Sequence, residues 1–257
     1  MKMTLKNKII FISMILLLIA SFGLMISNPF QNELITDAIV RTLYSIIILE
    51  IIWSLDIPIF HKQPSHHRMS ALFMIIPALL VTINNFPWLA FFKGYTTLNQ
   101  SATDIFYFIF YCISVGLFEE LIFRGLILSW LLDYFKSKKF PILKAMLLSS
   151  LLFAFLHIFN LFSGASPMTT LLQISYTFLT GLLWSAIFIL TKQLIYPIIL
   201  HAGYNIAGLL FPTLGTITGQ FDIWTIWITI IIGVFTGLYY LYLILKKEKI
   251  WFSNKGL

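Results

Sequence analysis

The sequence predicts an all-α polytopic membrane protein: a helical bundle of about eight transmembrane helices with both termini in the cytoplasm. Hydrophobic residues make up 59% of the 257 residues and charged residues only 11%, against about 25% charged in a typical soluble domain. The hydrophobic residues form long unbroken stretches, whereas the strands of an outer-membrane barrel alternate polar and apolar residues. Lysine and arginine, finally, gather on alternate connections between these stretches, as in a polytopic helical protein.

Eight apolar segments are the candidate membrane helices, because a helix rises about 1.5 Å per residue and the hydrocarbon core is roughly 30 Å thick. In chain order they are Ile9–Ile26, Leu34–Leu55, Met69–Phe92, Asp104–Leu132, Ala145–Phe162, Thr169–Leu190, Leu194–Phe211 and Ile223–Leu245. We expect Asn84, Asn85 and Pro87 to disturb the third segment locally. The connections are too short to be domains, so we predict a single membrane domain over residues 1–257, with a motif-bearing core at about 104–211.

The basic residues set the predicted orientation. Nearly all of them fall on one side of the eight-helix topology, and the opposite connections carry only Lys93. The residues on the first side are Lys2, Lys6, Lys8, Lys62, Arg68, Lys136, Lys138, Lys139, Lys144, Lys192, Lys246, Lys247, Lys249 and Lys255. The positive-inside rule therefore predicts that both termini are cytoplasmic. We attribute the net charge of +7 to this one-sided distribution of basic residues and not to nucleic-acid binding. We therefore expect no nucleic-acid partner.

Two adjacent glutamates lie inside the fourth apolar segment, in the stretch "GLFEELIFRG". A charge within a membrane helix costs roughly 2.5–3.5 kcal/mol on insertion scales. In a regular helix Glu120 and Arg124 are four residues apart on one face, which predicts an ion pair. Glu119 points about 100° away and has no obvious local partner, so it is available for proton transfer. The alternative is that both glutamates cap a cytoplasmic helix end.

Two further segments carry polar residues at helical spacing. "FAFLH" places Phe153 and His157 four residues apart, and a packing histidine is the alternative to a catalytic one. "HAGYN" places His201 and Asn205 on one face, where both side chains can donate to a developing oxyanion. In the predicted topology Glu119, His157 and His201 all fall in the cytoplasm-facing half of the bundle.

These three motifs resemble those of a known family. "EELIFR" matches an EExxxR motif, "FAFLH" an FxxxH motif and "HAGYN" an HxxxN motif, in the order found in CPBP intramembrane proteases. This family is also called the Abi, or CAAX-protease and bacteriocin-processing, family. The resemblance covers Glu119 to Asn205, about a third of the chain, and does not include the first three predicted helices.

The resemblance implies a mechanism of peptide-bond hydrolysis. Glu119 and His157 would activate the attacking water, His201 and Asn205 would hold the tetrahedral oxyanion, and the Glu120–Arg124 pair would shape the site. Phe153 would be a packing residue of its motif. We favour a reaction without a cofactor, because the chain has no HExxH motif. Zinc held by Glu119, His157 and His201 is the alternative, since such a set occurs in catalytic zinc sites.

The predicted activity is that of an intramembrane endopeptidase acting on a membrane-associated peptide or protein. Eukaryotic relatives in the resembling family trim prenylated CAAX proteins, and bacterial members act in bacteriocin or pheromone processing or in self-immunity. The Ile-, Phe-, Lys- and Asn-rich composition indicates an AT-rich bacterial genome, so we expect a bacterial cytoplasmic membrane and a peptide-processing or immunity role. Two alternatives remain: a non-catalytic peptide-binding immunity protein, and a transporter with a buried Glu/His relay.

Overall fold

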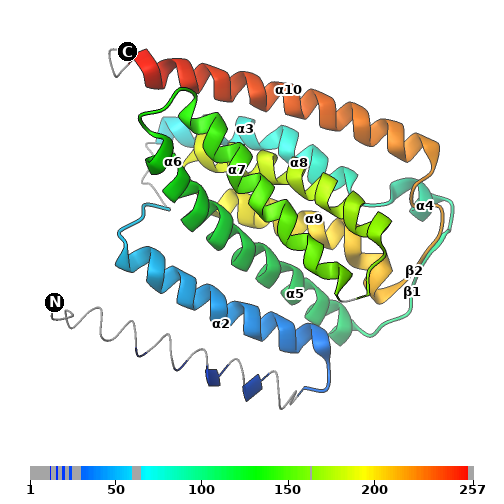
Figure 1. Cartoon of the computed structure of the whole chain (residues 1–257). Helices are drawn as coiled ribbons and strands as arrows, with labels where there is room; N and C mark the ends of the chain where they lie inside the picture. The colour runs from blue at the N-terminus through cyan, green and yellow to red at the C-terminus, as the bar shows by residue number, and fades with distance from the viewer. Residues whose placement is uncertain are drawn as a thin grey trace. The chain divides into compact units, whose positions relative to one another are not determined.

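The described part of the chain is helical apart from one short pair of strands (Figure 1). The computed structural model describes residues 30–59, 65–162 and 164–253, together with the single positions 12, 16, 19, 20, 23 and 24. Most of the first predicted helix, Ile9–Ile26, lies outside these residues. The all-α fold class predicted from the sequence is confirmed.

The helices and strands follow one another along the chain in a simple order. They are α2 (Glu33–Ser54), α3 (Ser65–Asn84), α4 (Trp88–Phe92), β1 (Thr96–Leu98), α5 (Ala102–Glu120), η1 (Leu121–Leu128), α6 (Ser129–Phe135), α7 (Pro141–Leu156), η2 (His157–Leu161), α8 (Pro167–Thr191), α9 (Ile195–Leu214), β2 (Gly215–Ile217) and α10 (Ile223–Ser253). Of these, η1 is a π-helix and η2 is a 3₁₀-helix.

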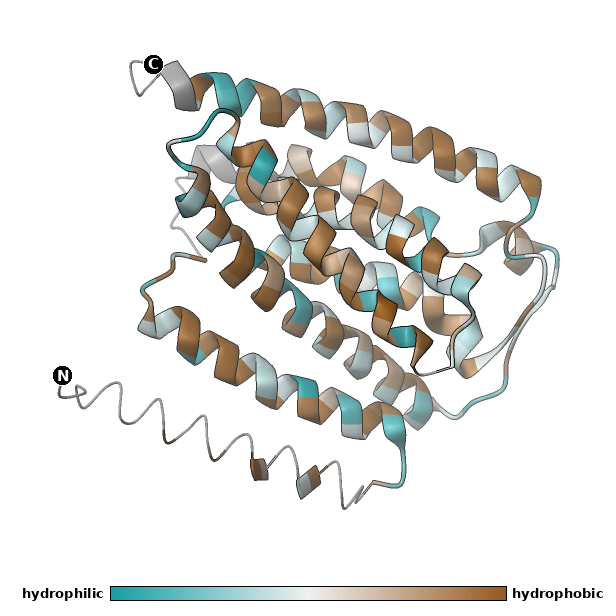
Figure 2. Cartoon of the chain, viewed as in Figure 1, coloured by the Kyte–Doolittle hydropathy of each residue, from teal (hydrophilic) through white to brown (hydrophobic). Residues whose placement is uncertain are grey.

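Within the described residues, five helices are long and apolar enough to cross a membrane. They are Ala102–Phe135, Pro141–Leu161, Pro167–Thr191, Ile195–Leu214 and Ile223–Ile250. Hydrophobic residues dominate all of them, with polar residues scattered between (Figure 2). The protein is therefore an integral membrane protein with several spanning helices. The count of eight spans and the cytoplasmic termini stay predictions.

The third predicted span is shorter in the structure than in the sequence analysis. We predicted one helix over Met69–Phe92, whereas α3 ends at Asn84 and the separate short helix α4 begins at Trp88. Asn85 donates from its side chain to the carbonyl of Tyr204 at 2.8 Å, and Pro87 has no backbone N–H to continue a helix. The disturbance expected at these residues is thus a complete break.

The fourth predicted span, Asp104–Leu132, is helical throughout but not regular. Its middle, Leu121–Leu128, is π-helical, with hydrogen bonds that span five residues instead of four. Side chains four residues apart across this stretch do not follow the spacing of a regular α-helix. No pattern in the amino-acid sequence indicates this change.

The described contacts divide the chain into two compact units. The first comprises the described residues up to Pro58 together with Leu79–Ile122 and Ile198–Gly233, and the second comprises Ile59–Ala78, Phe123–Pro197 and the described residues from Val234. In the first unit α2 packs along α5, and Phe108, Cys112 and Leu214 form a buried cluster.

Helices α5 and α9 approach each other closely at Gly116, within the first unit. A Cβ atom at Gly116 would lie 3.0 Å from the backbone nitrogen of Ala202 and 3.1 Å from the carbonyl oxygen of Ile198. Small residues let membrane helices come this close. Beyond the C-terminal end of α9, the chain continues into β2, which pairs antiparallel with β1, Thr97 lying opposite Thr216.

In the second unit α7 packs against α8. Helix α10 supplies a carboxylate to the start of α7. The Glu248 carboxylate accepts a hydrogen bond from the backbone N–H of Leu143 at 2.7 Å, and Glu248 is 2% exposed. The first N–H groups of a helix have no partner within the helix, and a negative charge there also interacts favourably with the helix dipole. Glu248 is thus a cap for α7 from another helix.

We expect Gly116→Ala to destabilise the protein by about 1–3 kcal/mol, because the new methyl group meets backbone atoms that cannot rotate away. The midpoint of thermal unfolding in detergent measures this. Gly233→Ala is the matched control, since a Cβ at Gly233 has nothing within 4 Å, and it should be neutral or stabilising by up to about 1 kcal/mol. Equal midpoints for the two variants would contradict the close contact.

Glu248→Ala should lower stability by about 1–2 kcal/mol, since it removes the cap and leaves the partly buried Leu143 N–H without this acceptor. Glu248→Gln retains an acceptor oxygen and should lose less. The exposed neighbour Lys249 provides the control variant Lys249→Ala. A wild-type unfolding midpoint for Glu248→Ala would show that the α7 N-terminus does not depend on this carboxylate.

Candidate active site

The last turn of α5 carries both glutamates of the first motif. Helix α5 begins with a capping box, in which the side chains of Ser101 and Asp104 each accept from the other residue's backbone N–H, and it ends at Glu120. Glu120 is fully buried, and 21% of the Glu119 side chain is exposed. An ionised carboxylate at such depth requires hydrogen bonds or an opposite charge to offset its desolvation.

His201 on α9 supplies that interaction to both glutamates. Its Nδ1 lies 2.7 Å from Glu120 Oε1, and its Nε2 lies 3.6 Å from Glu119 Oε2. The three side chains come from helices that contact each other at Gly116, one turn before Glu120, and at Ala202, which follows His201. The close approach of the two backbones therefore brings the imidazole between the two carboxylates.

The two contacts of His201 differ in kind. At 2.7 Å, Nδ1–H donates a short hydrogen bond to an ionised Glu120, and such charge-assisted bonds are about twice as strong as neutral ones. This bond fixes the orientation of the ring and the proton on Nδ1. The 3.6 Å between Nε2 and Glu119 exceeds the normal hydrogen-bond length. Nε2 and Glu119 are thus neighbours without a direct hydrogen bond, and neither engages the other as closely as Nδ1 engages Glu120.

Asn205 lies one helical turn after His201 in α9, partly buried. Residues four apart on an α-helix share a face, so the position of Asn205 agrees with the spacing from which its role was predicted. That role, donation to an oxyanion beside His201, stays a prediction.

His157 lies in the second unit, at the point where α7 ends. We predicted a helix over Ala145–Phe162, whereas the α-helix ends at Leu156 and the 3₁₀-helix η2 begins at His157. The imidazole Nδ1 lies 3.1 Å from the carbonyl oxygen of Phe153. Since a carbonyl only accepts, Nδ1 carries the proton and Nε2 is left with a lone pair. A lone pair on Nε2 is what a general base needs.

Phe153 connects His157 to the arginine of the first motif within the second unit. The Phe153 ring is T-shaped to the His157 ring with centroids 5.3 Å apart, and the guanidinium carbon of Arg124 lies 4.8 Å from the Phe153 centroid. Arg124 is fully buried, and its Nη2 donates to the carbonyl of Gly181 at 3.0 Å. The motif phenylalanine therefore contacts the motif histidine on one side and a buried cation on the other.

The sequence analysis missed two contacts of the motif residues, one in each unit. One is the Glu120–His201 hydrogen bond, and the other is the contact of Arg124 with Gly181 and Phe153. A backbone carbonyl such as that of Gly181 has no signature in the sequence. The predicted ion pair of Glu120 with Arg124 stays a prediction.

A metal site was the alternative to a cofactor-free mechanism. Among the residues that the structure describes, no group of three or more His, Cys, Asp or Glu side chains is placed to hold a metal ion. Zinc binding by Glu119, His157 and His201 stays the alternative, and a chelation experiment tests it.

Comparison with protein families gives one match. Residues 101–207 match the family described as Rce1-like, type II CAAX prenyl endopeptidase Rce1-like. No curated protein and no solved structure gives a significant match to the chain. The matched range begins at the N-cap of α5 and ends two residues after Asn205, so it includes all three motifs. The chain thus carries an Rce1-like CAAX prenyl endopeptidase domain of the CPBP family, which is a family of proteases.

Proposed function

We propose that this protein is an intramembrane endopeptidase that hydrolyses a peptide bond in a membrane-associated peptide or protein. The observation that carries the proposal is the convergence of Glu119 and Glu120 on the two ring nitrogens of His201 in a buried part of the first unit. Placing one fully buried and one partly buried carboxylate beside an imidazole costs desolvation free energy that their contacts only partly offset. Clusters of ionisable side chains of this kind are typical of catalytic sites.

In the proposed reaction Glu119, together with His157, takes a proton from a water molecule as its oxygen attacks the scissile carbonyl carbon. The carbonyl oxygen becomes an oxyanion, which accepts hydrogen bonds from His201 and Asn205. When the intermediate collapses, the C–N bond breaks and the proton taken from water passes to the leaving amine. No group other than water is consumed.

We assign positioning roles to the residues around these four. Glu120 holds His201 through the 2.7 Å bond to Nδ1, which directs Nε2 toward the reacting atoms. The stacked contact of Arg124 with Phe153, and the carbonyl of Phe153 itself, support the orientation of His157. When one ring nitrogen of a histidine donates to a fixed acceptor, the other nitrogen is the one that reacts.

The substrate class rests on composition and on the family. The family's description names CAAX prenyl endopeptidases, so a prenylated CAAX peptide is one candidate substrate. We favour a bacterial cytoplasmic membrane, with cytoplasmic termini, and a role in bacteriocin or pheromone processing or in self-immunity. A peptide-binding immunity protein without catalysis and a transporter with a Glu/His relay are the alternatives.

Glu119→Gln and His157→Ala should each lower kcat by about 10²–10⁴-fold, the usual contribution of a general acid or base. The assay uses purified protein in detergent with a panel of candidate peptides, and mass spectrometry of the products. Because the two groups act on one water, the double variant should lose little more than either single variant. Glu33→Gln, at the exposed start of α2, is the control.

The same assay separates the alternatives. Cleavage that persists in both single variants would refute the proposed mechanism, and biological protection that persists without cleavage would indicate a binding protein. Loss of cleavage with a chelator, restored by added zinc, would replace the cofactor-free mechanism by the zinc alternative.

Glu120→Gln should lower kcat about tenfold with little change in KM. The glutamine oxygen still accepts from Nδ1, but the bond loses its charge, a difference of about 1–2 kcal/mol. The loss should appear in the kcat of the folded protein, because His201 keeps an acceptor at Nδ1 but loses the charged one. A merely structural role would lower the unfolding midpoint and leave the kcat of the folded fraction unchanged, and that result would contradict the assignment.

A further inference from the structure

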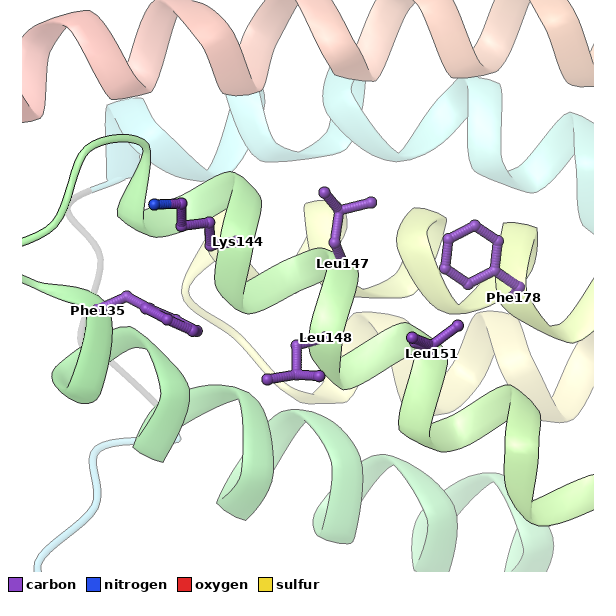
Figure 3. Close-up of a pocket in the computed structure, with 6 residues that line it drawn as sticks. All are labelled: Phe135, Lys144, Leu147, Leu148, Leu151 and Phe178. Atoms are coloured by element: carbon purple, nitrogen blue, oxygen red, sulfur yellow. The ribbon is translucent and has the colours of Figure 1, made fainter.

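An apolar hollow lies on the second unit, where α6, α7 and α8 meet. It has a volume of about 320 Å³ and is open to the surface. Its lining residues are Phe135 of α6, Lys144, Leu147, Leu148 and Leu151 of α7, and Phe178 of α8. Figure 3 shows Lys144 and Phe135 at one end and Leu151 and Phe178 at the other. The hollow is thus apolar along its length, with one cation at an end.

The end with Lys144 is also the basic end of this unit. The connection between α6 and α7 carries Lys136, Lys138 and Lys139, all exposed, like Lys144. The nearby acidic residues are Asp133, which pairs with Lys136 at 2.9 Å, and Glu248, which is bonded to the Leu143 N–H. Lys246, Lys247 and Lys249 flank Glu248 in α10. Positive charge therefore exceeds negative charge at this end.

This charged end marks the membrane surface. The connection joins two candidate spans, Ala102–Phe135 and Pro141–Leu161, so it lies where both reach the interface. From Lys144, the hollow extends along α7 to Leu151, about 10 Å at 1.5 Å per residue, into the depth occupied by lipid chains. Leu147, Leu148 and Leu151 are exposed, as expected for side chains that face hydrocarbon.

We propose that this hollow binds one anionic phospholipid of the bilayer. The headgroup phosphate lies at Lys144, with Lys138 and Lys139 adding to the attraction, and one acyl chain lies along Leu147, Leu148 and Leu151 toward Phe178. Basic pockets between membrane helices near the interface are suited to anionic headgroups. This site is separate from the proposed peptidase chemistry and does not depend on it.

Charge complementarity favours an anionic phospholipid over other molecules that could fill the apolar hollow. A zwitterionic lipid fills the apolar part equally well but gains less from the lysines, since its headgroup has no net charge. A hydrophobic helix from a second copy of this chain would carry its own lysines to the same end and repel. A negative headgroup joined to an apolar chain matches both ends of the hollow.

The test uses the purified full chain in nanodiscs of phosphatidylcholine that contain a minor fraction of a photoactivatable phosphatidylglycerol. After illumination, peptide mass spectrometry locates the crosslinks. We expect crosslinks at Leu147–Leu151 and around Phe178, reduced at least fivefold by Lys144→Gln. A photoactivatable phosphatidylcholine with the same chains should label these residues at least fivefold less than phosphatidylglycerol.

Two further variants make the result decisive. Leu148→Trp fills the hollow without a change of charge and should also reduce the crosslinks, provided that its unfolding midpoint matches wild type. Lys93→Gln removes an exposed cation outside the second unit and should have no effect. Equal labelling by the two lipids, or unchanged labelling in Lys144→Gln, would overturn the proposal. So would displacement of the label by a lipidated peptide but not by excess phosphatidylglycerol.

Discussion

The placement of His201 between one fully buried and one partly buried carboxylate is the constraint on which the first unit depends. Glu120 is fully buried, and its hydrogen bond to Nδ1 offsets part of the cost of removing that charge from water. The bond can form only because Gly116 lets α5 and α9 approach within backbone contact. The glycine at position 116 and the Glu120–His201 contact therefore depend on each other. A wider spacing of α5 and α9 would leave Glu120 buried without its imidazole.

The second unit also contains a buried charge that needs compensating contacts, in this case a cation. Arg124 is fully buried, and it is stabilised by the carbonyl of Gly181 and by the face of Phe153. A guanidinium binds both a carbonyl and an aromatic face well because it is planar and weakly hydrated. The same phenylalanine presents its carbonyl to His157. Stabilising the buried charge and orienting the imidazole therefore involve one residue, which gives a physical reason for the phenylalanine in the FxxxH motif.

The sequence predicted what depends on local patterns and missed what depends on contacts between helices. Apolar segment length gave the helical class, and Asn85 and Pro87 indicated where the third segment is interrupted. The π-helical stretch Leu121–Leu128 could not be foreseen, because hydrophobic periodicity is too coarse to distinguish hydrogen bonds spanning five residues from those spanning four. The motifs pointed to Glu119, His157 and His201 as candidate site residues, whose roles stay predictions. The partner of Glu120 was not visible, since regular helix spacing pointed only to Arg124.

The partners of the two imidazoles also distinguish their proposed roles. In both rings Nδ1 has a hydrogen-bond partner, so Nε2 is the nitrogen left for the role proposed for each. The partner of His157 is a neutral carbonyl, which suits a ring that acts through the lone pair of Nε2. The partner of His201 is a carboxylate, which stabilises positive charge on the ring whenever Nε2–H donates to an oxyanion. A general base and an oxyanion donor require opposite proton arrangements at Nε2, and the different acceptors at Nδ1 favour that division between the two histidines.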